Sequence, residues 1–157
     1  MGLGWATAGQ AQTSANAAAT ATAFVSGIAP LTASTSNNLN FGSVTAGTVA
    51  SPANLASDAA RFAISGQPST PVTVTFVLPT VLTGPGATTI PISFGGADGL
   101  EWNPYPSSHT TFNPNGAHLT SLDGSGNLTI GITGSVAPPL GSTTGSYTGT
   151  ITMTVAY

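Results

Sequence analysis

The C-terminal segment carries the clearest pattern of apolar and polar positions in the chain. From residue 147 onward every second residue is large and apolar, or Gly, and the residues between them are Thr or Ala. Because successive side chains of a strand point to opposite faces of its sheet, this pattern predicts a strand with one core face and one hydroxyl face. The predicted core face comprises Tyr147, Gly149, Ile151, Met153, Val155 and Tyr157.

Six earlier segments alternate in the same way and are separated by Gly, Pro, Asn and Ser, which favour turns. No segment sustains a helical period, and short strands at this spacing are typical of a β-sandwich. We therefore predict an all-β, antiparallel sandwich of about seven strands. The six segments are residues 17–33, 39–44, 59–64, 72–78, 90–94 and 128–132, and in the first of them Thr20, Thr22 and Phe24 alternate with Ala21, Ala23 and Val25.

Residues 95–125 lack this regularity and are predicted to form a long inserted loop. The segment contains three of the four acidic residues, both His residues and the aromatic residues Trp102, Tyr105 and Phe112. Long loops within compact domains tend to be functional or mobile. Two interpretations of the aromatic side chains stay open: they pack the loop against its own domain or a neighbouring subunit, or they form a surface on which a sugar stacks.

Charge is scarce. Only 3 % of residues are charged, against about 25 % in an ordinary soluble domain, and Arg61 is the only basic residue. A nucleic-acid binder needs basic side chains to displace counterions from phosphates, and binding to anionic lipid needs them too, so both classes are excluded. A surface with few charges is poorly protected against association, which favours a chain that packs against copies of itself. No segment reaches the roughly 18 consecutive apolar residues that suggest insertion into a membrane.

The sequence gives little support for a catalytic or metal-binding site. His109 and His118 lack the further ligands that zinc requires, and the chain contains no Cys. Residues 123–127 resemble an oxygen-rich calcium loop, but the downstream Glu is missing, so a hairpin turn is the better prediction. No nucleophile with an oriented base can be argued, so we predict no enzyme activity, no metal and no cofactor. Asp58 and Arg61 are close enough in sequence to form a local ion pair.

Four short segments, in this order, resemble a secreted bacterial pilin-like domain family. They are residues 39–42 (Leu-Asn-Phe-Gly), 60–66 (Ala-Arg-Phe-Ala-Ile-Ser-Gly), 126–131 (Gly-Asn-Leu-Thr-Ile-Gly) and the ending 145–157. The resemblance covers about residues 18–157 and implies an immunoglobulin-like sandwich, related in style to the pilins of chaperone–usher systems. In such pilins the sandwich lacks one strand, and the N-terminal arm of the next subunit fills the gap. Many of those pilins contain a disulfide, and this chain departs from them in having no Cys.

The chain then divides into an N-terminal arm, residues 1–17, and a sandwich, residues 18–157. Extended, the arm would reach roughly 50 Å at about 3.3 Å per residue, which is long enough to enter a neighbouring domain. Alternating Leu3, Trp5 and Thr7 are the side chains expected to enter the neighbour, and pairing of the arm with its own sheet is the alternative. The expected acceptor residues are Tyr147, Ile151, Met153, Val155 and Tyr157.

The expected function is that of a structural subunit. The resemblance implies a non-covalent extracellular filament, a pilus or fimbria, secreted to the bacterial cell surface and built as a helical homopolymer. Partners would be copies of the chain itself, together with an assembly chaperone and an outer-membrane usher. Because the chain has no Lys, cross-linking through a lysine amine is excluded. The alternative is a monomeric secreted adhesin or carbohydrate-binding module that uses residues 95–125.

Overall fold

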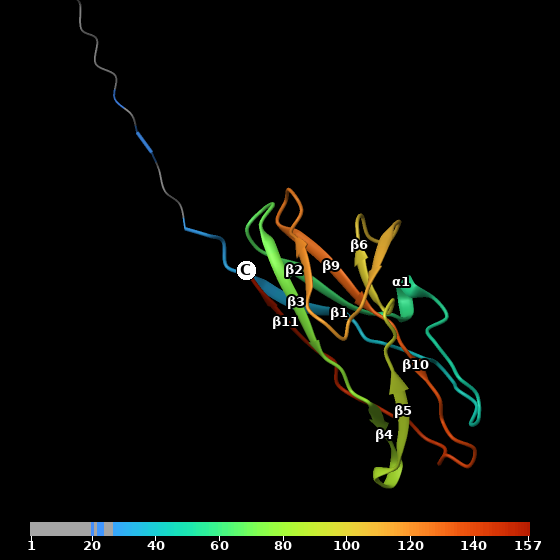
Figure 1. Ribbon diagram of the computed structural model, residues 1–157. Helices are drawn as coiled ribbons and strands as arrows, with labels where there is room; N and C mark the ends of the chain where they lie inside the picture. The colour runs from blue at the N-terminus through green and yellow to red at the C-terminus, as the bar shows by residue number, and fades with distance from the viewer. Residues whose placement is uncertain (1–19, 21, 24–26) are drawn as a thin grey trace, which may run out of the picture.

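The computed structural model describes residue 20, residues 22–23 and residues 27–157 (Figure 1). Within this part of the chain the fold is all-β and antiparallel, as predicted, with one short α-helix and one 3-10 turn. The helical elements are α1 (Leu55–Asp58) and η1 (Pro85–Ala87). The strands are β1 (Thr32–Asn37), β2 (Ala60–Ser65), β3 (Pro71–Val77), β4 (Val81–Thr83), β5 (Thr89–Ser93), β6 (Gly99–Trp102), β7 (His109–Phe112), β8 (His118–Ser121), β9 (Asn127–Ile132), β10 (Ser135–Val136) and β11 (Thr152–Ala156).

The strands form three sheets. The five-stranded sheet has the order β1-β2-β9-β6-β7, and a three-stranded sheet, β11-β3-β8, packs against it. The third sheet, β10-β5-β4, extends the sandwich at one end, because β10 follows β9 and β4 follows β3 along the chain. An isolated bridge between Thr83 and Thr148 continues the pairing of the C-terminal segment beyond β3.

The core lies between the apolar faces of the first two sheets. In β2 and β9 every second side chain is buried, and the register places Phe62 opposite Ile130 and Ile64 opposite Leu128. Val72 and Val74 of β3 face them from the other sheet. A second cluster of Leu82, Ile90, Ile92 and Val136 fills the end formed by the third sheet. Alternation in the sequence thus becomes two inward apolar layers, which confirms the predicted sandwich.

The two sides of the sandwich differ. On one side β7 and β8 are the edge strands of their sheets, and residues 113–117 join them, so the chain closes that side. On the other side the edge strands are β1 and β11, and no described strand lies between them. Tyr157 and Ala29 meet at one pole of this open side, where the Tyr157 hydroxyl donates to the Ala29 carbonyl oxygen. The sandwich is therefore closed on one side and open on the other.

Two predicted segments differ from the structure near the N-terminus. The first described strand begins at Thr32, and the described residues 20, 22, 23 and 27–31 belong to no strand; the rest of the predicted strand 17–33 before residue 27 lies outside the described residues. Residues 39–44 form no strand either. Gly42 has φ +66°, and its backbone N–H donates to the Asn40 side chain, so a turn interrupts the alternation there.

The prediction of a long loop at residues 95–125 is wrong, because this segment contains β6, β7 and β8. The apolar residues of β6, Leu100 and Trp102, lie on the outer face of the five-stranded sheet, where they form a separate cluster with Ala59. Short strands with their apolar face turned outward do not give the inward pattern that predicted the other strands. The insertion is part of the sandwich.

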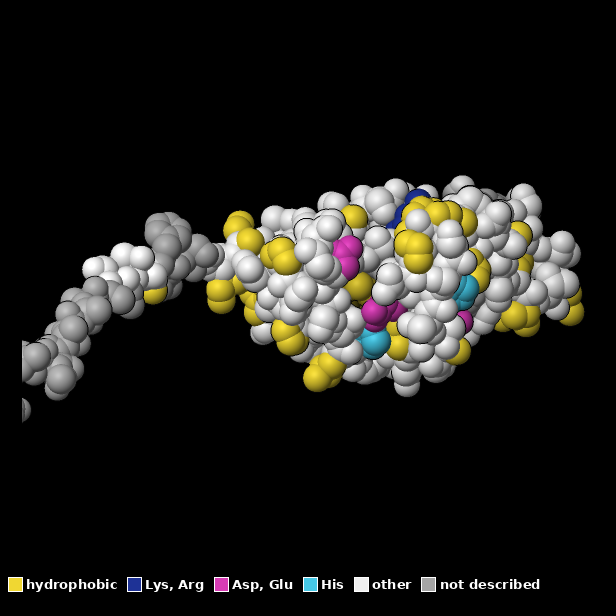
Figure 2. Space-filling model, turned by 90° about the horizontal axis from the view of Figure 1, so that it is seen from above, with side chains coloured by type: hydrophobic (Ala, Val, Ile, Leu, Met, Phe, Trp, Pro, Cys, Tyr) yellow, Lys and Arg dark blue, Asp and Glu magenta, His cyan; other side chains and the backbone are white. Residues whose placement is uncertain are grey.

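The surface is largely uncharged. On the face shown in Figure 2, backbone atoms and uncharged polar side chains predominate, and charged side chains stand apart from one another. Among the described residues no helix is long and apolar enough to cross a membrane.

Candidate functional site: a groove between two sheet edges

A groove follows the open side of the sandwich. One wall is formed by residues within 33–46, which are β1 and the segment after it, and the other by residues within 142–153, which lead into β11. The groove has a wide part of about 1060 Å³ and a narrow part of about 230 Å³. Thr35, Phe62 and Ile151 line both parts, so the two are continuous. We call this feature the edge groove.

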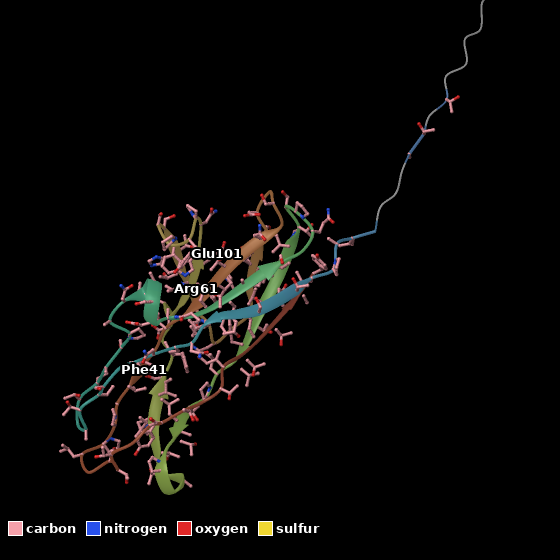
Figure 3. All side chains as sticks on the ribbon, turned by 180° about the vertical axis from the view of Figure 1, so that it is seen from behind. Phe41, Arg61 and Glu101 are labelled. Atoms are coloured by element: carbon pink, nitrogen blue, oxygen red, sulfur yellow. The ribbon has the colours of Figure 1, made fainter. Side chains whose placement is uncertain are left out.

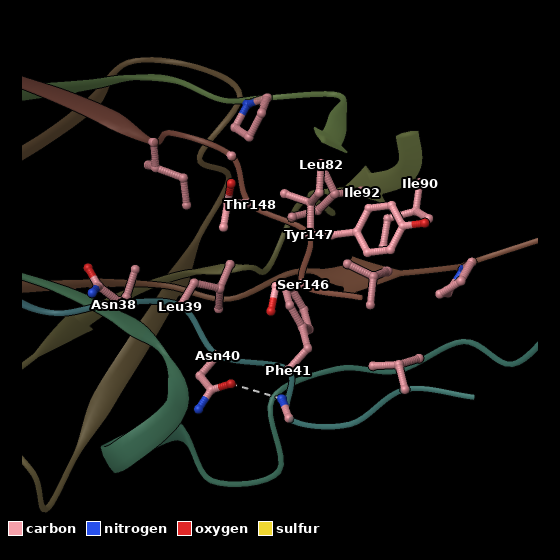
Figure 4. A pocket seen from close by; sticks show the side chains of 18 of the residues that line it. Asn38, Leu39, Asn40, Phe41, Leu82, Ile90, Ile92, Ser146, Tyr147 and Thr148 are labelled. Atoms are coloured by element: carbon pink, nitrogen blue, oxygen red, sulfur yellow. Dashed lines mark hydrogen bonds between the residues drawn. The ribbon is translucent and has the colours of Figure 1, made fainter. Parts of the chain in front are cut away.

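The floor of the wide part is apolar. It is formed by residues of the third sheet: Leu82 of β4, Ile90 and Ile92 of β5, and Val136 of β10. Figure 3 places Phe41 toward this end of the molecule, apart from Arg61 and Glu101. In the close view, Leu82, Ile90 and Ile92 gather beside the ring of Tyr147 (Figure 4). A side chain that entered here would exchange water for hydrocarbon contacts, which is favourable in proportion to the apolar area buried.

The walls of the wide part come largely from segments outside the strands, and the bridge between Thr83 and Thr148 is their one point of strand-like pairing among the described lining residues. Leu39, Phe41 and Val44 pack onto the floor cluster from one side, and Tyr147 packs onto it from the other. The Tyr147 hydroxyl donates to the Thr143 carbonyl oxygen, 2.7 Å away, which fixes the ring. A Cβ atom at Gly84 would lie 2.5 Å from that ring, so the ring position requires glycine there. The walls are thus held by their own local contacts.

The apolar face of β11 is only half-buried. Ile151, Met153 and Val155 are partly exposed, whereas Val72 and Val74, in the core, are 2 % and 0 % exposed. The intervening Thr residues of β11 are exposed, so the predicted alternation is present. The predicted acceptor residues Tyr147, Ile151 and Met153 line the groove or its floor, Val155 packs on the core, and Tyr157 lies at the pole, where it is 48 % exposed. The partial burial follows from the open side beside them.

Both edges of the groove offer unpaired backbone. Among the described residues β11 pairs only with β3, and β1 pairs only with β2. An edge strand presents a row of free N–H and C=O groups, and an extended segment from another chain can add to it as a further strand. Side chains on alternate positions of that segment would meet the apolar floor. The arrangement is therefore suited to binding one extended peptide. The described lining of the groove contains no His, Asp, Glu or Arg side chain.

The predicted donor residues Leu3, Trp5 and Thr7, and the arm of residues 1–17, lie outside the described residues. The sequence prediction also missed Leu39, Phe41 and Val44 as groove residues. Their alternation indicated a strand, and the residue that could have corrected this is Gly42, whose φ of +66° breaks the strand.

The five-stranded sheet separates Phe112 from the other two aromatic residues of the predicted loop, Trp102 and Tyr105. Trp102 is 6 % exposed on the outer face, with its ring centroid 5.2 Å from that of Tyr105. Phe112 packs inward, 6.4 Å from Phe76 and 3.9 Å from the ring of His118. Tyr105 is 39 % exposed. They therefore do not form one continuous surface for stacking.

Arg61 does not pair with Asp58, so that prediction is wrong. Its guanidinium lies 4.3 Å from the centroid of the Tyr105 ring and hydrogen-bonds the Tyr105 hydroxyl. It also donates to the Ala56 carbonyl oxygen and to the Ser36 hydroxyl. Asp58 instead accepts a hydrogen bond from the Asn54 backbone N–H, at the start of α1. Uncharged acceptors and an aromatic face satisfy the single basic residue.

The two His residues have separate surroundings. His109 packs against Trp102, with ring centroids 4.7 Å apart. His118 Nε2 lies 2.7 Å from Glu101 Oε2, and this contact joins the two sheets on the closed side of the sandwich. The part of the chain that the structure describes contains no group of three His, Cys, Asp or Glu residues placed to hold a metal ion. Asp123 Oδ1 accepts from the backbone N–H groups of Ser125 and Asn127, as a hairpin turn requires.

Removing the contact between the sheets gives a first testable prediction. Glu101→Ala is expected to lower the free energy of unfolding by about 1–2 kcal/mol, because His118 is left without its partner in a half-buried site. Urea unfolding followed by fluorescence measures this. Thr111→Ala, on the exposed part of β7, is the control and should change stability little. An unchanged urea midpoint for Glu101→Ala would show that the contact contributes nothing.

Comparison with known families closes the description of the site. The model of a family described as "Domain of unknown function (DUF4402)" matches residues 42–157. This span contains strands β2–β11, the floor of the edge groove and the whole wall that leads into β11. None of the curated proteins matches the chain. Because the match covers well over half of its length, the chain belongs to the DUF4402 family.

Proposed function

We propose that this protein is the structural subunit of a non-covalent extracellular filament, a pilus or fimbria on a bacterial surface. In this proposal the N-terminal segment of one copy fills the edge groove of the next copy as an added strand. The observation that carries the proposal is the open side of the sandwich, where a groove with an apolar floor follows the free edges of β1 and β11. An immunoglobulin-like, pilin-like sandwich that lacks one strand would have such a side.

The energetics favour a strand over a small ligand. The groove is long and continuous, and its polar groups are Asn, Ser and Thr side chains of its walls together with the free backbone N–H and C=O groups of two strand edges. An extended peptide satisfies those groups along its whole length and buries alternate side chains, which is how β-strand addition obtains both affinity and specificity. The half-buried Ile151 and Met153 would lose their remaining exposure on insertion.

Donor and acceptor surfaces lie at different poles. The chain leaves the sandwich near Ala29, which is bonded to Tyr157 at the end of β11. The wide end of the groove lies at the opposite pole, beside the loops of residues 41–50 and 137–146 (Figure 1). An interface between two different surfaces of identical subunits adds subunits without limit unless its rotation closes a ring. This geometry supports an open, helical homopolymer.

Further properties fit a secreted filament. The surface is uncharged over wide areas, so copies can pack without strong repulsion (Figure 2). An unfilled groove with free strand edges is prone to wrong association. A chaperone that covers the groove before assembly, and an outer-membrane usher that receives the subunit, would solve this problem.

The alternative function is a secreted adhesin or carbohydrate-binding module. It has less support, because Trp102 is covered and Phe112 packs inward. Tyr105 is the one aromatic side chain of the three that is more than a third exposed, and Arg61 already lies against its ring.

Removal of the N-terminal segment tests the proposal. The full chain is expected to form filaments, and a chain lacking residues 1–26 to remain monomeric, because it keeps every described strand but has lost the donor. Sedimentation and negative-stain microscopy of the two chains measure this. Monomers from both chains would contradict the proposal, and filaments from both would show that assembly uses another surface.

A further inference from the structure

We infer that residues 17–25 of a neighbouring copy, rather than the first residues of the arm, are the strand that fills the edge groove, and that they run antiparallel to β11. This inference rests on the proposed function and specifies its donor. Four features of the chain carry it: the pattern of residues 17–25, the point at which the chain leaves the sandwich, the length of the groove, and the direction of β11.

The first feature is the alternating sequence of residues 17–25. Residues 17–25 alternate with period two, yet the described residues within them, Thr20, Thr22 and Ala23, belong to no strand and are exposed. β1 begins only at Thr32. A segment whose sequence alternates like a strand, and whose described residues are exposed, is suited to pairing with another chain. Its apolar face comprises Ala17, Ala19, Ala21, Ala23 and Val25, and the opposite face comprises Ala18, Thr20, Thr22 and Phe24.

The second feature is the anchor at residue 29. The Ala29 backbone N–H donates to the side chain of Gln67, 3.1 Å away, and its carbonyl oxygen accepts from the Tyr157 hydroxyl, 2.7 Å away. Leu31 packs against the main core cluster. The sandwich therefore holds the chain from residue 29 onward. Ile28, immediately before the anchor, is 70 % exposed.

Length decides which segment reaches the groove. The wall of residues 145–153 spans about 30 Å at about 3.3 Å per residue, which nine residues of a donor would match. Residue 25 lies four residues before the anchor, so it reaches about 13 Å from the donor's own sandwich. Placing Leu3, Trp5 and Thr7 in the groove would instead leave about 20 residues, up to about 70 Å of chain, between two sandwiches. Residues 17–25 fill the groove of a subunit that touches the donor.

Direction follows from the two poles. β11 runs from the wide end of the groove toward Tyr157, beside the narrow end. The acceptor's own chain leaves at the narrow end, so the wide end is the unobstructed entrance for a neighbour. A donor that enters there has Val25 at the wide end and Ala17 at the narrow end, and it runs antiparallel to β11. The larger side chain then lies in the larger part of the groove, and Ala residues lie in the part of about 230 Å³.

The first experiment uses the full chain with charge placed on the donor. The double substitution Ala21→Asp with Ala23→Asp is expected to reduce sedimentable protein at least tenfold, because two carboxylates would face an apolar floor. Gln10→Asp with Gln12→Asp adds the same charge elsewhere in the N-terminal segment and should leave assembly near the wild-type level. Equal assembly by the two variants would overturn the assignment of residues 17–25.

The second experiment separates this inference from the proposed function. Synthetic peptides of residues 15–27 and of residues 1–13 are titrated onto a chain lacking residues 1–26, and binding is followed by calorimetry and by the unfolding temperature. Binding of the first peptide alone, at least tenfold tighter than the second, is the expected result. Binding of the second peptide alone would overturn the inference and leave strand exchange intact. Binding of neither peptide would overturn both.

Discussion

Moving residues 15–26 from the front of the chain to a position after Tyr157, through a short turn, is expected to give a monomer with a filled groove. A strand that follows β11 through a hairpin runs antiparallel to it, which is the direction inferred for the donor. When donor and acceptor are linked in one chain, the effective concentration of the donor strand at the groove is in the millimolar range. The free energy of unfolding should exceed that of the chain lacking residues 1–26 by about 3 kcal/mol, as for a ligand present at a few hundred times its Kd.

Thermal unfolding and gel filtration measure this outcome. For a chain of this length, about 3 kcal/mol corresponds to a rise of roughly 6–12 °C in Tm. The matched control carries Ala21→Asp and Ala23→Asp in the relocated segment and should unfold like the chain without it. If both relocated segments stabilise the chain equally, the face that carries residues 21 and 23 does not contact the groove, and the antiparallel arrangement loses its support.

Core and groove residues are expected to respond differently to truncation. Ile130 is 0 % exposed, so Ile130→Ala should lower the free energy of unfolding by about 3–4 kcal/mol, whether or not the groove is filled. Ile151 lines the open groove. Ile151→Ala should therefore lower the free energy of unfolding by about 1 kcal/mol in the open chain, which lacks residues 1–26, and by about 3 kcal/mol in the chain with the relocated strand. The reason is that Ile151 becomes fully buried only when a strand covers it.

Denaturant unfolding of four variants, each substitution in each chain, tests this difference. The Ile130→Ala pair serves as the internal control, since its two values should agree within about 0.5 kcal/mol. An Ile151→Ala cost that does not change between the open and filled chains would mean that the added strand does not lie over this part of the groove.

The sandwich could be predicted from the sequence because its inward faces alternate strictly. The buried pairs of β2 and β9 and the Thr-separated apolar residues of β11 produce a period of two that few other structures share. The groove could not be predicted in the same way. Its walls at Leu39 and Phe41 depend on a turn at Gly42, and its open side depends on which strands are edges, which no local pattern states.

Two other differences arise from contacts between residues that are distant in sequence. β6 was missed because Leu100 and Trp102 face outward, and their cover comes from Ala59, about 40 residues earlier in the chain. Arg61 was assigned to Asp58 on sequence proximity. The structure instead gives it a carbonyl oxygen, a hydroxyl group and the ring of Tyr105, which lies 44 residues away. Partners that are distant in sequence decided both cases.

The environment of Arg61 has a consequence for digestion of the protein by proteases. Trypsin-like proteases cleave after Lys or Arg, and this chain contains a single such residue. That residue lies in β2, a central strand paired on both sides, and three groups hold its side chain. Cleavage would require the strand to leave the sheet, so the rate of digestion should follow unfolding of the core rather than fraying of a loop. The scarcity of basic residues is thus also expected to make the chain resistant to digestion by this class of enzymes.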